Sequence, residues 1–228
     1  MKVEMAKWYN KHANETAVII GNGPSLTLEQ IDKLSKYVTF GSNAIYDLPY
    51  QPTYYSIVDR EMLDACLPLP EDFKPTMFLR AEAKVDNNNP IYPIVAGGFS
   101  RNIDNFVIMG GTVTYVLMQI AYYMGFTKLL LLGIDHYYPS IPVQPGQSFI
   151  AGQDDPNHFK RKDGSPYFST GKCYNAPEIE RTTTTYSWAK EFFALEGRRI
   201  INLTPDSKLD VFEKMSIDQW LQYDRQHT

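Results

Sequence analysis

A short polar turn follows the first apolar stretch of the sequence and joins it to a segment with helical spacing. In "AVIIGNGPSL", residues 17–26, four small or β-branched residues precede two glycines, an asparagine and a serine. Glycines let backbone amides approach an anion, and short polar side chains before a helix add hydrogen-bond donors. The residue types suited to holding a phosphate group are therefore Gly21, Asn22, Gly23 and Ser25.

This turn departs from two well-known glycine-rich phosphate motifs. Leu26 stands where the dinucleotide-binding fingerprint has its third glycine, and the next expected strand ends in Asn43, not in a ribose-binding carboxylate. No lysine follows the glycines, as the phosphate loop of ATPases requires. The pattern argues against an NAD enzyme and a Walker-type ATPase. A tight turn without a ligand remains the alternative.

Polar residues also stand at the ends of three further expected strands. Asn43, Asp59 and Asp135 follow apolar stretches, and Gly111 and Thr112 form part of a second glycine turn that leads into a helix. Ligands of open α/β sheets bind at the carboxyl ends of the strands, so we expect these residues to form one polar rim. Each of them taken singly also has an ordinary role as a turn former or a helix cap.

An irregular segment, approximately residues 136–178, interrupts the alternation of strands and helices. It contains six prolines and four glycines and has no convincing periodicity. Long segments of this kind are usually lids, binding loops or disorder. His158 lies in it, and histidine is the residue type whose charge changes closest to neutral pH, as a general base needs. Tyr137, at its start, has a hydroxyl that can donate to a departing phosphate. A solvated loop histidine is the alternative for His158.

The rest of the chain alternates short apolar stretches with amphipathic ones. We expect strands at 17–21, 38–42, 54–58, 76–79, 128–133 and 199–203. We expect helices at 60–65, 112–124 and 179–196, and another that begins with a capping box at Thr27. Strands that are apolar on both faces are typical of parallel sheets. The sequence therefore predicts a three-layer, Rossmann-like α/β fold with a mostly parallel sheet, in one domain over residues 1–228.

Composition limits the classes of partner. The formal net charge is −4 and the basic residues are spread thinly, which disfavours nucleic acid and anionic membranes. The longest apolar run, "KLLLLGI", is too short to span a bilayer, and the first residues lack the apolar core of a signal peptide. Cys66 and Cys173 show no metal-ligand spacing, so we expect reduced thiols and a cytoplasmic protein.

Four stretches in this order and spacing resemble a known family. They are "VIIGNGPSL", "FGSNAIYDL", "GGTVTYVLMQIAYYMGFTKLLLLGIDHY" and "GRRIINLTP". They are similar to bacterial glycan sialyltransferases that use CMP-sialic acid, and equally to the wider superfamily of the archaeal hydroxymethylpterin pyrophosphokinase. Flagellin-glycosylating motility accessory factors are similar to the same superfamily. The resemblance covers approximately residues 17–215 and does not specify the substrate.

The resemblance implies roles for particular residues. In the sialyltransferases, the matching positions of Asn22, Ser25 and Asn43 bind the CMP-sugar. The tyrosine that matches Tyr137 contacts the CMP phosphate and eases its departure, and the histidine nearest to His158 is the general base. The sequence also departs from the family, because the arginine that usually precedes the second glycine turn is replaced by "IM" at 108–109. Arg101 is the nearest alternative, and this departure puts a carboxylated donor in doubt.

Three functions follow from these expectations. The first is a glycosyltransferase that needs no cofactor and takes a CMP-activated donor and a glycan acceptor. The second is a pyrophosphokinase that uses ATP and Mg²⁺ on carboxylates such as Asp59, Asp135, Asp154 or Asp155, with the basic residues 160–162 closing over the phosphates. The third is a non-catalytic nucleotide-sugar-binding protein. A homo-oligomer is compatible with each.

Overall fold

The computed structural model describes residues 5–139, 141–168 and 170–227. Within these residues the main sheet has seven parallel strands in the order β11-β10-β7-β1-β2-β3-β4. The strands are β1 (Thr16–Ile20), β2 (Val38–Ser42), β3 (Tyr54–Ile57), β4 (Thr76–Leu79), β7 (Lys128–Leu132), β10 (Arg199–Asn202) and β11 (Glu213–Lys214). All six strands expected from the sequence are present, with ends within one residue of the expected ones.

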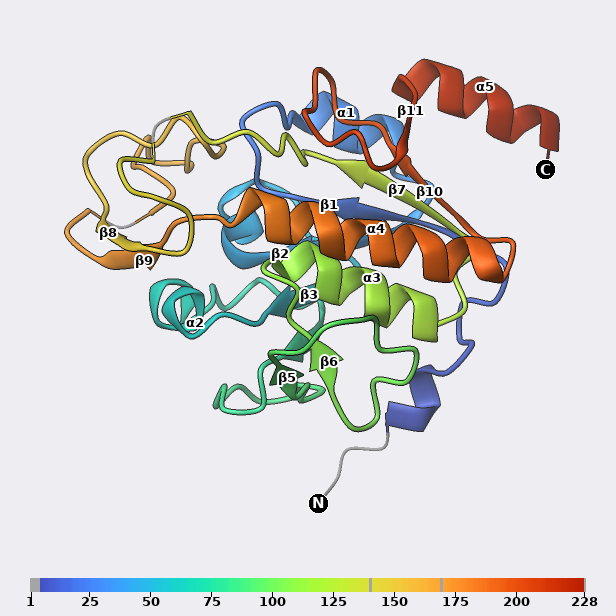
Figure 1. Ribbon diagram of the computed structural model, residues 1–228, viewed down its shortest axis with the longest axis horizontal. Helices are drawn as coiled ribbons and strands as arrows, with labels where there is room; N and C mark the ends of the chain where they lie inside the picture. The colour runs from blue at the N-terminus through green and yellow to red at the C-terminus, as the bar shows by residue number, and fades with distance from the viewer. Residues whose placement is uncertain (1–4, 140, 169, 228) are drawn as a thin grey trace.

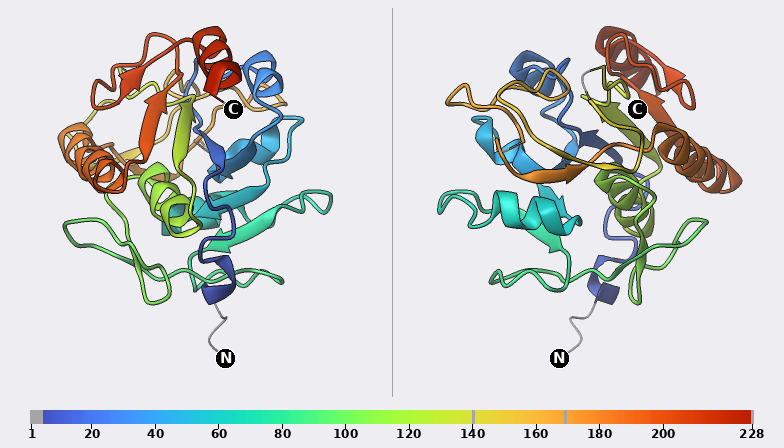
Figure 2. Two further views of the ribbon diagram at one scale, coloured as in Figure 1. Left: turned by 90° about the vertical axis from the view of Figure 1, so that its right-hand side faces the viewer. Right: turned by 60° about the vertical axis from the view of Figure 1, so that its left-hand side comes forward.

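Helices cover both faces of this sheet (Figures 1 and 2). On one face lie α3 (Val113–Tyr123) and α4 (Ile179–Leu195). On the other lie α1 (Leu28–Lys33), α2 (Arg60–Cys66) and α5 (Ile217–His227). Along β1, Ala17 and Ile19 pack into the first layer and Val18 and Ile20 into the second, as the alternation of a strand dictates. The predicted three-layer α/β fold is confirmed.

Helix α3 lies in the interior and fixes the loop that leads to the site. All of its residues are buried, and Thr112 caps its first turn by accepting a hydrogen bond from the Thr114 amide. Gln119, fully buried on this helix, accepts from the amides of Ser100 and Ile108 and donates to the Ile108 carbonyl at 2.7 Å. These bonds satisfy a buried amide and hold the segment before the second glycine turn against the helix.

The segment predicted as an irregular lid is more ordered in its structure than expected. It contains an antiparallel ribbon of β8 (Ser148–Ile150) and β9 (Cys173–Asn175). Phe159, Tyr167 and Tyr174 are 2–6% exposed and join the cluster formed by α1, α2 and the sheet. The absence of periodicity was therefore misleading, because this segment is anchored by single aromatic side chains and not by an amphipathic face.

Some elements were not predicted from the sequence. They are the short 3₁₀ helices Met5–Trp8 and Asn43–Asp47, the pair β5 (Pro93–Ile94) and β6 (Val107–Ile108), strand β11 and helix α5. Strands of two residues are too short to show an alternating pattern. In the described part of the chain, no helix has the length and apolar character needed to cross a membrane.

Candidate functional site

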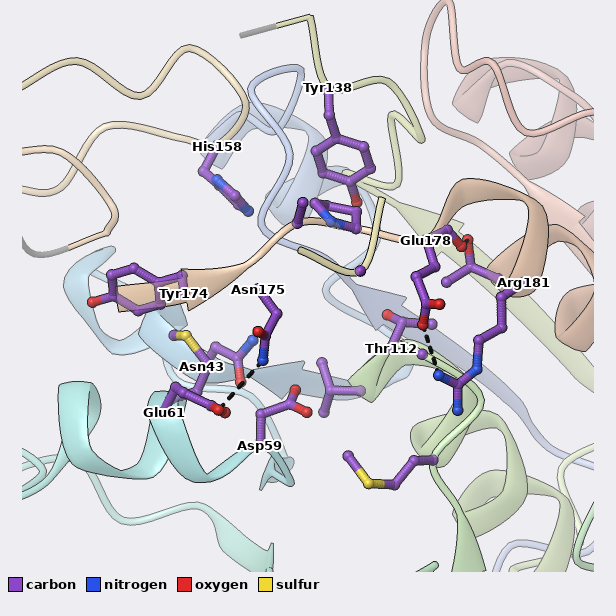
Figure 3. A pocket seen from close by; sticks show the side chains of 18 of the residues that line it. Asn43, Asp59, Glu61, Thr112, Tyr138, His158, Tyr174, Asn175, Glu178 and Arg181 are labelled. Atoms are coloured by element: carbon purple, nitrogen blue, oxygen red, sulfur yellow. Dashed lines mark hydrogen bonds and ion pairs between the residues drawn. The ribbon is translucent and has the colours of Figure 1, made fainter. Parts of the chain in front are cut away.

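Two cavities that share lining residues lie where the carboxyl ends of β1, β2, β3 and β7 meet the lid segment, and Figure 3 shows the larger one. The larger has a volume of about 450 Å³ and the inner one about 110 Å³. The larger volume is in the range of small-molecule sites. The predicted site residues that line one or both cavities are Gly21, Asn22, Gly23, Asn43, Asp59, Gly111, Thr112, Asp135, Tyr137 and His158. Of the residues expected at the two glycine turns and the strand ends, only Ser25 lines neither cavity.

Three asparagines that line the inner cavity have unpaired side-chain oxygens. The side-chain oxygens of Asn22, Asn43 and Asn157 are buried and have no hydrogen-bond partner among the described residues. The Asn22 amide nitrogen donates to Ser42 Oγ at 3.2 Å, which directs its oxygen elsewhere. Buried polar atoms are normally paired, so three unpaired acceptors around one cavity suit a ligand that carries hydroxyl or amino groups.

The first glycine turn is packed against the chain itself. A Cβ on Gly23 would lie 1.8 Å from Asp135 Oδ2, and one on Gly21 would lie 2.4 Å from the Gly133 carbonyl oxygen. Ser25 Oγ donates a hydrogen bond to Asp135 Oδ2 at 2.9 Å. Burial raises the pKa of Asp135, although this bond to Ser25 opposes the shift. The anion held by Ser25 is therefore a carboxylate of the protein, and the glycines are required by internal packing.

His158 is held by a carboxylate. Its Nδ1 lies 2.9 Å from Asp155 Oδ2, and the two side chains are 15% and 6% exposed. Burial by itself raises the pKa of Asp155, but the hydrogen bond and charge of His158 outweigh it and hold the pKa below the ordinary value. An ionised Asp155 accepts the Nδ1 proton, which leaves Nε2 of a neutral ring free to accept a proton.

Aromatic rings fix the plane of His158. The ring stacks on Tyr167 with 4.1 Å between centroids and 8° between planes, and Phe168 packs edge-on at 4.9 Å. The next residue, Phe159, donates its backbone N–H to the carbonyl of Asn22 at 2.9 Å. The lid segment is thus tied to the first glycine turn beside the histidine. The alternative that His158 is a solvated loop residue is wrong.

The two neighbouring tyrosines after β7 differ in which cavities they line. Tyr137 is 55% exposed and lines the inner cavity, whereas Tyr138 lines both cavities and its ring centroid lies 6.4 Å from that of His158. Figure 3 shows Tyr138 directed into the larger cavity. Burial raises the pKa of Tyr138 well above its ordinary value, so its hydroxyl stays protonated. The sequence "HYY" in an irregular segment carries no signal that distinguishes the two.

Carboxylates line the side of the larger cavity below His158 (Figure 3). Asp59 precedes α2 but makes no side-chain cap to it. Burial, with a smaller contribution from Glu61, raises the pKa of Asp59 to about 6 against the attraction of Arg80. Glu61 accepts a hydrogen bond from Asn175 at 3.4 Å. Asp59 is thus positioned by the helix start but faces the cavity.

His136 lies between the two cavities and α4. Its backbone has a φ of +54°, and its Nε2 lies 2.9 Å from Thr183 Oγ1. Burial lowers the pKa of His136 below its ordinary value. A neutral His136 that lines both cavities adds polar capacity without adding positive charge.

The basic residues expected near the site are elsewhere. Arg161 pairs with Asp47 at 2.8 Å and donates to the Tyr167 carbonyl, while Lys160 and Lys162 are exposed and line neither cavity. The expected basic closure over phosphates is therefore wrong. Arg101 is also exposed and lines neither cavity. Among the described residues, no group of three or more His, Cys, Asp or Glu side chains is arranged to hold a metal ion.

Sequence reasoning missed a charged pair at the start of α4. Arg181 Nη1 lies 2.7 Å from Glu178 Oε2, and both side chains line the larger cavity. The spacing of three residues at a helix start is common on exposed helix surfaces, so it indicated no site. The signal that could have identified the pair is its position directly after the lid segment.

No family model matches the sequence, and no curated protein matches it. Among solved structures, the fold is similar to that of the MAf glycosyltransferase from Magnetospirillum magneticum AMB-1, with a TM-score of 0.55 and 15% sequence identity over 92% of this chain. The match covers 35% of that protein, so this chain spans about a third of its length. At this level of identity the likeness concerns the three-layer α/β fold.

Proposed function

We propose that this protein is a glycosyltransferase that moves a sugar from a CMP-activated donor to a glycan acceptor. The observation that carries the proposal is the Asp155–His158 pair, because Asp155 holds Nδ1 of a histidine that lines both cavities and Nε2 has no partner among the described residues. The fold shared with a glycosyltransferase and the sequence resemblance to CMP-sugar enzymes both support this activity over other uses of such a pair.

The arrangement suits a direct displacement at the sugar. The oxygen of the acceptor hydroxyl forms a bond to the anomeric carbon as the bond from that carbon to the CMP phosphate oxygen breaks. CMP leaves with the electron pair, and the acceptor proton passes to Nε2 of His158. In this proposal Tyr138, whose hydroxyl is kept protonated by burial, donates to the departing phosphate, with the neighbouring Tyr137 as the alternative donor.

Release of CMP tests this proposal. The purified protein is incubated with CMP-N-acetylneuraminate and lactose in EDTA, and CMP and the sugar product are separated by chromatography. Wild-type protein should release CMP, and His158→Ala should lower turnover by about 100-fold or more with little change in CMP affinity. His227→Ala, an exposed histidine of α5, is the matched control and should retain full activity.

Pyrophosphoryl transfer from ATP to hydroxymethyl-dihydropterin is the rival, because Asp59 and Glu61 supply carboxylates at the cavity. It predicts activity that EDTA eliminates, full activity of His158→Ala, and a large loss in Asp135→Asn. The non-catalytic alternative predicts CMP binding without turnover. Either result would reject the glycosyltransferase.

A further inference from the structure

The described residues that line the two cavities include one strong cation. Arg181 is the only arginine or lysine among the described residues that line them, whereas Asp59, Glu61 and Glu178 supply three carboxylates to the larger cavity. An anionic ligand therefore meets repulsion over most of the wall and attraction at one place. Figure 3 shows Arg181 and Glu178 at the side of the cavity opposite Asn43, Glu61 and Asn175.

The ion pair between Arg181 and Glu178 is weak enough for Arg181 to bind another acceptor instead. Its partner Glu178 is 2.7 Å away, but the side chains are 38% and 41% exposed. Ion pairs of this exposure contribute little to stability. A guanidinium carries five N–H donors, and within the described residues Arg181 makes one hydrogen bond. The remaining donors are available to a second acceptor.

The second glycine turn packs against the arginine. A Cβ on Gly111 would lie 3.7 Å from Arg181 Cδ, which is ordinary van der Waals contact, and 3.0 Å from Thr182 Cγ2, so the turn lies directly against the stem of the arginine. Thr112, next in the turn, lines both cavities and caps the amino end of the 11-residue helix α3. The guanidinium and the amino end of this helix thus lie on the same side of the cavity and add to each other's field.

We propose that Arg181 binds the anionic group of the donor, a phosphate or a sugar carboxylate, and that Glu178 occupies the guanidinium when the cavity is empty. The identity of the donor rests on the proposed function, but the anion site does not. Planar N–H pairs of arginine match the oxygens of both groups. Arg181 is then a specificity-determining residue on α4, supplied from a different element than the one that the sequence resemblance indicated.

Two simple anions test the site without any nucleotide. Inorganic pyrophosphate and N-acetylneuraminate are titrated against the wild-type protein, and Kd is obtained from the rise in melting temperature with concentration. The stronger of the two probes should bind Arg181→Gln about 10-fold or more weakly, since a charge-assisted bond is lost. Arg181→Lys keeps the charge but lacks the planar donors, so its Kd should lie between those of the wild type and Arg181→Gln. Preference for one probe distinguishes a phosphate site from a carboxylate site.

Glu178→Gln gives a result of opposite sign. Removal of the competing carboxylate should tighten the same probe about 2- to 5-fold, because the free protein no longer has an ion pair to break. If the ion pair only held the local structure in place, both Arg181→Gln and Glu178→Gln would bind the probe more weakly. Arg199→Gln is the matched control, since Arg199 pairs with Glu213 at 41% and 48% exposure and lines neither cavity.

Three outcomes would overturn the anion site: neither probe binds, Arg181→Gln binds as wild type does, or Glu178→Gln binds more weakly. Arg181 and Glu178 are partly exposed, so each variant is expected to keep the wild-type melting temperature without ligand. Probe binding that depends on Arg181, together with absent CMP-sugar turnover, would reject the proposed function and retain the anion site. If CMP-sugar turnover is unchanged in Arg181→Gln and neither probe binds, the anion site is rejected and the proposed function is retained.

Discussion

Ser25 donates a hydrogen bond from Oγ to Asp135 Oδ2 at 2.9 Å and so ties the turn after β1 to the end of β7. The two strands are adjacent in the sheet, with Ile20 opposite Leu132. The carboxylate occupies the space that a side chain at residue 23 would need. The glycine and the serine of this turn are therefore explained by contact with β7, whereas Asn22 and Asn43 line the inner cavity.

Gly23→Ala should destabilise the fold. The new Cβ would lie 1.8 Å from Asp135 Oδ2 and 2.8 Å from the Gly133 carbonyl oxygen, so the turn and β7 would have to separate. Overpacking of this kind costs about 1–3 kcal/mol. Urea unfolding measures the loss. Gly152→Ala is the control, because a Cβ there meets no atom within 4 Å. Equal stability of the two variants would contradict the packing argument.

Asp155→Asn should impair catalysis more than binding. Without the carboxylate charge the Nδ1 tautomer of His158 is no longer favoured, and Nε2 is less available as a base. Turnover should fall by about 100-fold or more, with nucleotide affinity within about 2-fold of wild type. The neighbour Asp154 is exposed, and Asp154→Asn is the control. Similar turnover in both variants would remove the role assigned to Asp155.

Asp59 should make stability depend on pH. Its native pKa of about 6 is above the ordinary 3.8, so the native state binds more protons than the unfolded state between these values. The carboxylate therefore destabilises the protein above about pH 6, by up to about 3 kcal/mol, and this penalty disappears as the pH falls to about 4. Asp59→Asn should be more stable than wild type at neutral pH and should lose that advantage in acid.

Urea unfolding of wild type and Asp59→Asn across this pH range measures the difference. Asp64→Asn, at an exposed position on the same helix, controls for the loss of one negative charge. A constant difference between wild type and Asp59→Asn at all pH values would contradict the raised pKa.

Asn157→Ala should weaken binding of the nucleotide donor. The amide oxygen of Asn157 is buried at the inner cavity without a partner, so its removal costs the unliganded protein little. Loss of one hydrogen bond to the ligand should raise Kd by about 3- to 10-fold. Asn22→Ala and Asn43→Ala should behave in the same direction. Isothermal titration with CMP checks the effect, and unchanged affinity in all three variants would mean that the ligand lies outside the inner cavity.

The central part of the fold could be predicted from the sequence because its signals are local. "KLLLL" at 128–132 has no polar face and is a buried parallel strand, and Thr27 with Gln30 forms the expected capping box. The proximity of the polar residues after β2, β3 and β7 could be predicted, because the carboxyl ends of parallel strands lie at one edge of the sheet. The structure places Asn43, Asp59 and Asp135 at that edge.

Side-chain direction in the lid segment could not be predicted. Nothing local tells that Tyr138 and not Tyr137 enters the larger cavity, because an irregular backbone has no period that assigns faces. Asp155 was considered with Asp154 as a cation site, although its separation of three residues from His158 also fits a hydrogen-bonded pair. The pairing of Asp155 with His158 depends on the turn at 155–158, where the backbone N–H of Asn157 donates to Asp155 Oδ1 at 3.0 Å.

The hydrogen bond between Phe159 and Asn22 has a consequence for biosynthesis. The first polar turn emerges from the ribosome early. Its strand β1 can pair with β7 only after β7 has been synthesised, and the inner cavity is complete only after the lid segment has been synthesised. No amino-terminal fragment that stops before the lid segment contains all the residues that line the two cavities. The donor that we propose would therefore stabilise the chain only after most of the polypeptide has been synthesised.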